Sequence, residues 1–400
     1  MATDDPPRRS LPVLGGAAPT PPPGPALRPG DGPETLNLSL SAPCQQRCSF
    51  CTLHTVVPVS EEAHARAMRV FERDLRAAGA AGTRVLRING IEPLAAAYLF
   101  DLLAVARASG FTEYEVHSTC RPLADPALAA RLVEALGPRY RIMVPVYGST
   151  AATHDAVVGV DGAFDSLQTA LGNLRRLGAS GDRVHFQTVA TRENLRDLPA
   201  IGRLVAGLVG GPAQAFGRWR VHLPFPSGGP DAEAAYARVA VSMTELLDAL
   251  YAPGARARWD LLEPGEVLPC VALRHQDATG HELLAPSRLH RAPSLAANRY
   301  LGSRIAKSTG GGSKEHPAVG TLGCPHRLSC ALGSSCRGEV YELYARRFGL
   351  GELRPVTPRQ VDALPSPRAR ARRLALRAWL RGRALVGAAL SARRAGPPRG

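Results

Sequence analysis

Strand-like and helix-like segments alternate between residues 35 and 225, and this alternation limits the possible folds more than any other feature of the sequence. Six segments have the apolar and β-branched pattern of strands: residues 36–40, 85–90, 114–119, 141–148, 184–190 and 220–225. Five segments between them repeat apolar residues at helical spacing: residues 61–79, 94–109, 126–136, 163–177 and 198–209. Because helices that connect successive strands produce parallel pairing, we predict an α/β fold. Six strands favour an open, partial (β/α)6 barrel of the TIM type over the closed form.

The ends of the chain differ in composition from this central region. Ten of the first 34 residues are prolines, which predicts a disordered leader. Residues 366–400 contain ten arginines and no acidic residue, so the tail carries most of the net charge of +15. The tail could form a basic amphipathic helix that contacts an acidic membrane surface, RNA or an acidic partner, or it could be a solvated appendage. No recognised RNA-binding module accompanies it, so nucleic acid is not an expected partner.

The chain has no apolar run long enough to span a membrane and no secretory signal at its N-terminus, which predicts a cytoplasmic protein. In that reducing compartment, clustered cysteines are expected to bind metal and not to form disulfides. Three of the eight cysteines lie within PCQQRCSFC, at positions Cys44, Cys48 and Cys51. These thiolates could ligate three irons of a 4Fe-4S cluster and leave the fourth iron open. The alternative is a zinc site completed by His54.

The C-x3-C-x2-C spacing after the first strand, with Phe50 just before the last cysteine, resembles the radical S-adenosylmethionine (radical SAM) superfamily. The resemblance implies that the open iron binds S-adenosylmethionine (SAM). It also implies that one electron from the cluster cleaves SAM to a 5′-deoxyadenosyl radical, with a flavodoxin or ferredoxin as the reductant. Phe50 is then expected to contact the cofactor.

The end of the second strand reads NGIEPL, which is similar to the Gly-Gly-Glu-Pro motif of this superfamily. The resemblance implies that Gly90 allows the backbone to approach SAM closely, and that Glu92 or nearby carbonyl groups receive the amine of SAM. Pro93 completes the motif. A turn before a helix is the alternative, because proline favours the first helical position.

Two further stretches, residues 144–178 and the segment TRENL at 191–195, resemble the fourth and fifth strand regions of superfamily members with cysteine-rich extensions. Proline occupies position 145, where those members often have serine, so the expected cofactor contacts shift to Tyr147 and Ser149. Arg192 and Asn194 are weaker cofactor candidates, with a capping role for Asn194 as the alternative. His154 and Asp155 could form an acid–base pair, but adjacent helical residues point in different directions, which favours structural roles.

The remaining clustered cysteines are Cys270, Cys324, Cys330 and Cys336, which could complete a closed 4Fe-4S site. This arrangement resembles the auxiliary-cluster extensions of SPASM or Twitch type, although a full SPASM domain has more cysteines. The alternatives are a structural zinc site that uses His326 or His316, or Cys270 as an ordinary buried thiol.

Cys120 belongs to neither group of cysteines and follows the third strand, where related enzymes commonly have Thr-Asn-Gly. Its thiol could hand a hydrogen atom to a substrate radical as a catalytic residue. The alternative is a small buried side chain, because cysteine is among the most buried residue types.

We therefore expect a radical SAM enzyme that abstracts a hydrogen atom from a peptide or natural-product precursor. Modification of a tetrapyrrole or another small molecule is an alternative, as is a non-catalytic iron–sulfur or zinc protein. The expected domain organisation is a leader at 1–34, the barrel at 35–225, a connecting helical segment at 226–259, the auxiliary-cluster region at 260–354 and the arginine-rich tail at 355–400.

Overall fold

The architecture is known from a computed structural model. It describes residues 35–40, 42–51, 61–179, 183–208, 219–226, 231–251, 262–264, 267–279, 303–307, 320–333, 336 and 339–362. The leader, most of the arginine-rich tail, His54 and His316 lie outside the described residues. Within the described part of the chain, no helix is both long and apolar enough to cross a membrane.

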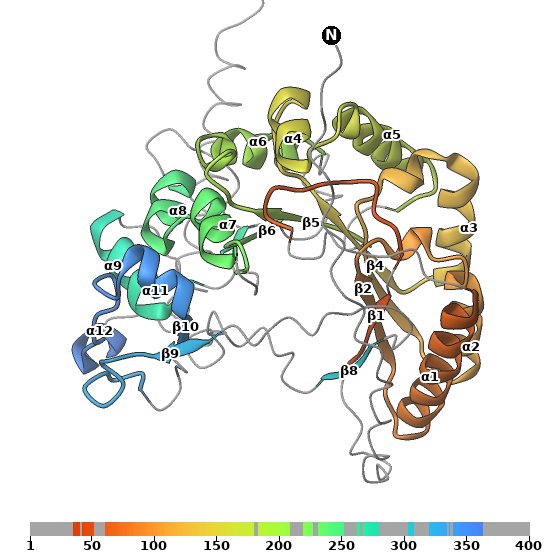
Figure 1. Cartoon of the computed structure of the whole chain (residues 1–400), viewed down its shortest axis with the longest axis horizontal. Coiled ribbons are helices and arrows are strands. Elements are labelled where there is room, and N and C mark those ends of the chain that lie inside the picture. Colours follow the sequence, from red (N-terminus) through yellow and green to blue (C-terminus); the bar gives the residue numbers. More distant parts are fainter. Residues whose placement is uncertain are drawn as a thin grey trace, which may run out of the picture.

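A parallel sheet forms the centre of the protein, and its middle strands are the six predicted from the sequence (Figure 1). They are β1 (Thr35–Leu40), β2 (Val85–Gly90), β3 (Glu113–His117), β4 (Tyr140–Pro145), β5 (Val184–Val189) and β6 (Trp219–His222). Neighbouring strands in sequence pair with each other throughout, and every pairing is parallel. The prediction of an α/β fold with a parallel sheet is therefore confirmed.

The sheet has two more strands than the sequence pattern predicted. β7 (Leu262–Pro264) pairs with β6, and β8 (Ser303–Lys307) pairs with β1, so the order is β7-β6-β5-β4-β3-β2-β1-β8. All six predicted strands are present, and the two edge strands are additional to them. Both added strands come from the part of the chain that the sequence assigned to the auxiliary region, and both are short. A three-residue strand that ends in proline gives almost no periodic signal.

The barrel region has one helix in each of the five predicted segments and one more, at residues 151–158, that was not among them. These helices are α1 (Glu61–Ala80), α2 (Leu99–Ala108), α3 (Pro126–Leu136), α4 (Ala151–Val158), α5 (Ala163–Arg176) and α6 (Leu198–Leu208). In Figure 1, α1, α2, α3 and α5 follow one another along the outer side of the sheet. The predicted helix at 94–109 is interrupted, because a short 3-10 turn at Pro93–Ala95 precedes α2.

The chain after β6 forms a smaller group of elements on the side of the molecule away from α1 and α2 (Figure 1). It comprises α7 (Ala232–Val239), α8 (Met243–Leu250), α9 (Pro269–Thr279), β9 (Thr321–Gly323), β10 (Glu339–Tyr341), α11 (Glu342–Phe348) and α12 (Pro358–Asp362). β9 and β10 pair in an antiparallel sheet of their own. Tyr344 and Val340 pack into the same apolar core as the barrel, so this group is attached to the sheet through buried contacts.

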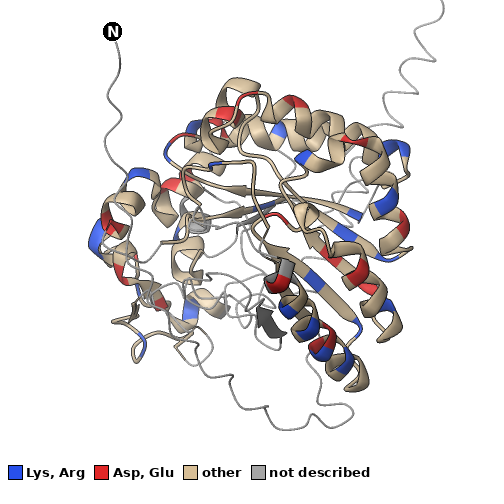
Figure 2. Ribbon diagram, turned by 45° about the vertical axis from the view of Figure 1, so that its right-hand side comes forward, with Lys and Arg blue, Asp and Glu red and all other residues tan. Residues whose placement is uncertain are grey.

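The two faces of the sheet have different chemistry because successive side chains of a strand point to opposite sides. Leu36 and Leu38 of β1, and Leu86 and Ile88 of β2, are fully buried in the apolar core. The alternate positions on the inner face are largely polar, and charged positions are visible on the strands themselves in Figure 2. The inner face of the sheet is therefore the more polar of its two faces.

Candidate functional site

The loop that carries the first three cysteines follows β1 and rests on the end of α4. Its backbone donates hydrogen bonds from Arg47 N to Val158 O at 2.8 Å and from Ser49 N to Val157 O at 2.9 Å. These carbonyls lie in the last turn of the helix, where no intrahelical donor remains for them. Gly159 has a φ of +65°, and a Cβ there would lie 2.9 Å from the Arg47 carbonyl oxygen. The helix end therefore holds the cysteine loop at close range.

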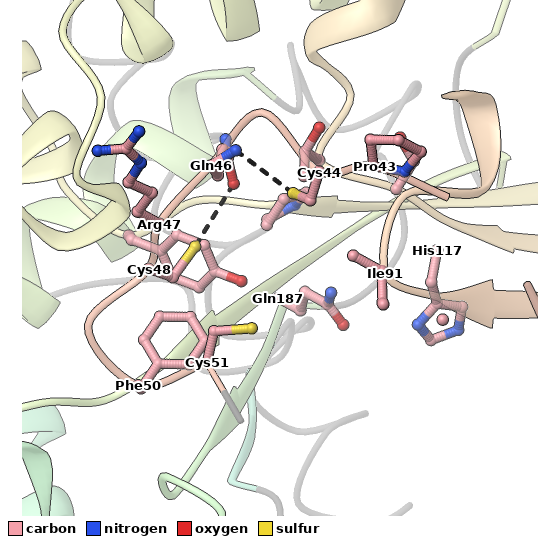
Figure 3. Close-up of a pocket in the computed structure, with 15 residues that line it drawn as sticks. Pro43, Cys44, Gln46, Arg47, Cys48, Phe50, Cys51, Ile91, His117 and Gln187 are labelled. Carbon is pink, nitrogen blue, oxygen red and sulfur yellow. Dashed lines mark hydrogen bonds between the residues drawn. The ribbon is translucent and has the colours of Figure 1, made fainter. Parts of the chain in front are cut away.

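The three thiols of this loop are partly or fully buried and lie near one another. Gln46 contacts two of them: its backbone N donates to Cys44 Sγ at 3.4 Å, and its Oε1 accepts from Cys48 Sγ at 3.5 Å (Figure 3). Burial raises the pKa of Cys44, and burial together with the neighbouring thiols of Cys51 and Cys44 raises the pKa of Cys48 to about 12. Cys44 and Cys48 therefore stay protonated until a metal displaces their protons.

A cavity of about 610 Å³ opens beside the three cysteines, at the carboxyl ends of the strands. This volume is in the usual range for small-molecule and cofactor sites, about 300–1,000 Å³. Its walls come from the cysteine loop and from the ends of β2 to β5: Pro43, Cys44, Gln46, Arg47, Cys48, Phe50, Cys51, Gly90, Ile91, His117, Ser118, Thr119, Pro145, Tyr147 and Gln187. Figure 3 shows side chains of these elements around one space. Ligands bind at this end of parallel strands in α/β proteins.

Gly90 lies at the point where β2 meets the cavity wall. Its φ is +120°, and a Cβ there would lie 2.1 Å from the backbone oxygen of Leu40. The next residue, Ile91, donates its backbone N–H to the same oxygen at 3.2 Å. Only glycine fits this position without movement of the β1 backbone, so the sequence motif has a clear steric basis.

Glu92 is buried behind the cavity wall and ties two loops together. Its carboxylate accepts hydrogen bonds from Leu94 N at 3.0 Å, Ser118 Oγ at 2.8 Å and Thr119 N at 2.8 Å, and also from the Thr119 hydroxyl. Glu92 is not among the residues that line the cavity, and neither is Pro93, which starts the 3-10 turn. The geometry favours a role in which Glu92 fixes the loops after β2 and β3.

Tyr147 and Phe50 form an aromatic wall next to the cysteines. Their ring centroids are 4.9 Å apart in an edge-on arrangement, and both residues line the cavity. Burial raises the pKa of Tyr147 well above its ordinary value, and four nearby cysteines, the three of the loop and Cys120, raise it further. Tyr147 therefore keeps its phenolic proton and can donate or accept a hydrogen bond.

Three other cofactor candidates lie outside the cavity wall. Ser149 donates to Asp197 through both its backbone N and its hydroxyl, each at 2.6 Å. Asn194 is fully buried. Its Nδ2 donates to the backbone oxygen of Tyr147, after β4, at 3.0 Å and to the backbone oxygen of Val189, on β5, at 3.0 Å. Arg192 is exposed. Asn194 makes no side-chain cap to the following 3-10 turn, so it connects the ends of β4 and β5 instead.

The adjacent pair after β4 points in two directions, as helical geometry requires. His154 is buried, and its Nδ1 accepts a hydrogen bond from Tyr147 N at 3.3 Å. Burial lowers the pKa of His154 to about 4, so the imidazole is neutral. Asp155 accepts from Gly162 N at 2.7 Å and from Phe164 N at 2.8 Å, which supports the start of α5. The contacts of both residues, His154 and Asp155, are therefore structural.

The cavity wall contains polar residues that the sequence reasoning did not find. His117 ends β3, Gln187 lies in β5, and both point toward the cavity in Figure 3. His117 Nε2 is 2.7 Å from Glu115 Oε1. Burial lowers the pKa of His117 despite this partner, so the ring is neutral. The signal available in the sequence was only a polar residue near a strand end, which does not tell which way the side chain faces.

Cys120 is fully buried and packs in the main apolar core. It does not line the cavity, and its Sγ lies 3.6 Å from the backbone oxygen of Ser118. Its φ of +62° is a left-handed conformation that glycine adopts more easily. The geometry favours the packing interpretation of Cys120 over contact with a substrate.

The four remaining clustered cysteines come together between α9 and the segment that follows β9. Cys270, Cys330 and Cys336 pack against one small apolar cluster formed by Leu273, Leu332 and Val356. Burial raises the pKa of Cys270, and the nearby thiols of Cys324 and Cys330 raise it further. Cys330 Sγ also accepts a hydrogen bond from Val356 N at 3.3 Å. Backbone N–H groups directed at sulfur are typical of the surroundings of metal-bound thiolates.

Comparison with known proteins gives one informative sequence match. No protein-family model matches the chain. Over 149 residues the chain is 31% identical to the AdoMet-dependent heme synthase of Nitratidesulfovibrio vulgaris. The match covers 37% of this chain and 36% of the relative, so it spans little more than a third of either protein. Together with the cysteine motif, this similarity supports the radical SAM superfamily.

Solved structures resemble the fold more distantly. Streptococcus suis SuiB bound to precursor peptide SuiA is 13% identical with a TM-score of 0.46, over 69% of this chain and 58% of that chain. Coproporphyrinogen III oxidase (HemN) from Escherichia coli, a radical SAM enzyme, is 15% identical with a TM-score of 0.40, over 55% and 51% of the two chains. Both likenesses are too weak to carry an argument about function.

Proposed function

We propose that this protein is a radical SAM enzyme that abstracts a hydrogen atom from an organic substrate. The observation that carries the proposal is the placement of Cys44, Cys48 and Cys51 on the wall of the large cavity, directly after β1. Gly90 lies on the same wall, where it keeps the backbone accessible. A protein that only carried a cluster would need neither the cavity nor this close approach.

The side chains present fit the implied cofactors. Three thiols are soft ligands of the kind that hold an iron–sulfur cluster. When bound, the cluster and SAM supply the 5′-deoxyadenosyl radical. Tyr147 and Phe50 would form one wall of the SAM site. On the opposite wall, the backbone beside Gly90 would form hydrogen bonds with the polar groups of SAM.

The second group of cysteines is proposed to hold an auxiliary 4Fe-4S cluster. Cys270, Cys324 and Cys330 lie close enough to influence one another electrostatically, and Cys336 packs with two of them. The auxiliary cluster would bind substrate or pass an electron, and a flavodoxin or ferredoxin would reduce the first cluster. Ser149, Arg192 and Asn194 would then support the SAM site indirectly through the loops.

The proposed substrate is a peptide or natural-product precursor, and a tetrapyrrole is the second candidate. The sequence match to an AdoMet-dependent heme synthase favours the tetrapyrrole. The matched part is only about a third of that protein, so it supports the chemistry of the barrel more than the identity of the substrate. Mass changes in host extracts incubated with the reconstituted protein would distinguish the two candidates.

The iron content and the release of 5′-deoxyadenosine test the proposed function. We expect about eight irons per chain after anaerobic reconstitution, because two cubes hold about four each. The variant Cys324→Ala, Cys330→Ala, Cys336→Ala should keep about half. The parent should release 5′-deoxyadenosine with SAM and a strong reductant. About four irons with one zinc in the parent would contradict the auxiliary cluster, and no 5′-deoxyadenosine would contradict the enzyme.

Cys120→Ala separates packing from hydrogen donation. Because the side chain is buried in the core, we expect the variant to make the same product and to lose about 1 kcal/mol of stability. The measurements are product mass and thermal unfolding. An altered product with normal release of 5′-deoxyadenosine would instead support Cys120 as the hydrogen donor.

A further inference from the structure

Two polar side chains on the cavity wall have no part in the proposed cluster and SAM contacts. His117 ends β3 and Gln187 lies in β5, and both line the cavity of about 610 Å³. In Figure 3, His117 lies across the space from Cys48 and Cys51, and the carboxamide of Gln187 points toward the His117 side. Both side chains therefore have open space next to them.

Glu115 determines which nitrogen of the His117 ring carries the proton. Its Oε1 lies 2.7 Å from His117 Nε2. The same carboxylate accepts from Arg87 Nε at 2.6 Å and from Arg141 Nη1 at 3.2 Å. Burial raises the pKa of Glu115, but His117 and Arg87 together lower it below its ordinary value, so the carboxylate is ionised. Because an ionised carboxylate only accepts hydrogen bonds, Nε2 carries the hydrogen of this contact and Nδ1 keeps its lone pair.

Nδ1 of His117 is an acceptor that opens to the cavity. Burial lowers the pKa of His117, and the charges of Arg87 and Arg220 lower it further, although the contact with Glu115 raises it. The ring is therefore neutral. Within the described part of the chain, no group donates a hydrogen bond to Nδ1, and this atom is not buried. The exposed part of the side chain, 23%, borders the cavity.

Gln187 adds a donor and a second acceptor to the same wall. Its carboxamide has no hydrogen-bond partner among the described residues and is not buried. Ser118 and Thr119 also line the cavity, but their hydroxyl groups donate to Glu92 instead. His117 Nδ1 and the carboxamide of Gln187 are therefore available for a ligand on this side of the cavity.

Together these two groups match a secondary amide, which has one N–H donor and one carbonyl acceptor. His117 Nδ1 can accept from the N–H, and the carboxamide NH2 of Gln187 can donate to the carbonyl oxygen. Among the described residues that line the cavity, Arg47 is the only arginine, lysine or acidic residue, and it belongs to the cysteine loop. The far side of the cavity thus favours a neutral polar group over a carboxylate, which binds best to a cation.

We propose that His117 and Gln187 hold a secondary amide of the substrate, such as a peptide bond, on the side of the cavity away from the cysteine loop. Glu115 is a positioning residue, because it keeps the ring proton on Nε2. The inference rests on the proposed function, since it assigns a chemical class of substrate to the same cavity. It favours a peptide over a tetrapyrrole, whose ring nitrogens have no carbonyl group beside them.

A matched pair of neutral probes tests the inference on the whole reconstituted protein. N-benzylacetamide and benzyl acetate differ by one N–H group. Anaerobic weak-affinity chromatography on immobilised protein, with saturating SAM in the buffer, gives a dissociation constant for each probe, and a column without protein corrects for the matrix. The parent should bind the amide roughly tenfold more tightly than the ester, because one hydrogen bond to a desolvated acceptor supplies about this factor.

Two substitutions of His117 separate a substrate contact from support of the fold. His117→Asn places an amide oxygen near the position of Nδ1 but loses the contact with Glu115, whereas His117→Gln reaches Glu115 and leaves no acceptor at Nδ1. The preference for the amide should be largely kept in the first variant and lost in the second. Gln187→Leu should weaken both probes, which share the carbonyl group, and keep their ratio. The matched control, Gln168→Leu on α5, lies away from the cavity wall and should change neither.

A purely structural role of His117 predicts the reverse order of the two variants. Retention of the preference in His117→Gln with its loss in His117→Asn would overturn the inference. So would equal binding, or no binding, of both probes to the parent, and that comparison holds even if a substitution prevents folding. Thermal unfolding verifies that each variant is folded. A fall in SAM affinity in His117→Gln, measured by equilibrium dialysis, would make His117 a cofactor contact and also overturn the inference.

The release of 5′-deoxyadenosine is measured separately on the same protein. A parent that prefers the amide but releases no 5′-deoxyadenosine would keep the amide site and reject the radical SAM function. A parent that releases 5′-deoxyadenosine but binds both probes equally would reject only the amide site. The failure of the inference and the failure of the proposed function are therefore distinguishable.

Discussion

The variant Cys44→Ala, Cys48→Ala, Cys51→Ala is expected to release no 5′-deoxyadenosine above the background without enzyme. In a site-differentiated cube each of these thiolates holds a separate iron, so their removal takes away the electron source. The variant should also lose about half of the iron, with the auxiliary site retained. The assay is anaerobic incubation with SAM and a strong reductant, followed by chromatography and mass spectrometry.

The same variant has a clear folding control. The cysteine loop is held by backbone hydrogen bonds from Arg47 and Ser49 to the end of α4, and these contacts do not involve the thiols. Circular dichroism and the unfolding temperature should therefore stay close to those of the apo parent. Release of 5′-deoxyadenosine at the level of the parent would reject the assignment of these cysteines.

Gly90→Ala is expected to have the second largest effect, on both stability and SAM binding. The added Cβ would lie 2.1 Å from the Leu40 oxygen, so β1 and the loop after β2 must separate. The positive φ adds strain, and the two effects together should cost about 3 kcal/mol or more. Thermal unfolding and SAM affinity by equilibrium dialysis measure the two consequences.

Gly82→Ala is the matched control for Gly90→Ala. Gly82 has a φ of +97°, but nothing lies within 4 Å of its Cβ position. This substitution therefore carries the backbone strain alone, which is about 1 kcal/mol, and it lies far from the cavity wall. Equal losses of stability and unchanged SAM affinity in both variants would show that the contact with Leu40 has no functional importance.

The central fold was predictable because its elements have strong local signals. β2 and α3 have the predicted bounds, since β2 ends at a glycine and α3 begins with a proline capped by Asp125, which accepts from Ala127 N at 2.9 Å. The edge strands were not predictable. β8 is SRIAK, a short mixed segment whose strand conformation depends on the exposed edge of β1. Its partner lies far away in the sequence, so no local pattern identifies it.

The candidate site was predictable only where a residue type has a special chemical or steric property. The cysteines of the loop after β1 and Gly90 have such properties. His117 and Gln187 are ordinary polar residues within strands, and the sequence alone does not tell whether they face solvent or a cavity. Conversely, Ser149 and Asn194 resemble ligand contacts in sequence, but in the folded chain their side chains bond to Asp197 and to backbone carbonyls.

The pairing of β8 with β1 has a consequence for synthesis of the chain on the ribosome. β1 is made at residues Thr35–Leu40, but the strand that covers its outer edge is made only at Ser303–Lys307. Until then, a nascent barrel exposes a row of unpaired backbone groups on its first strand, and such edges readily pair with other chains. Late closure of this edge predicts that truncation before residue 303 yields a barrel that aggregates even though its six central strands are complete.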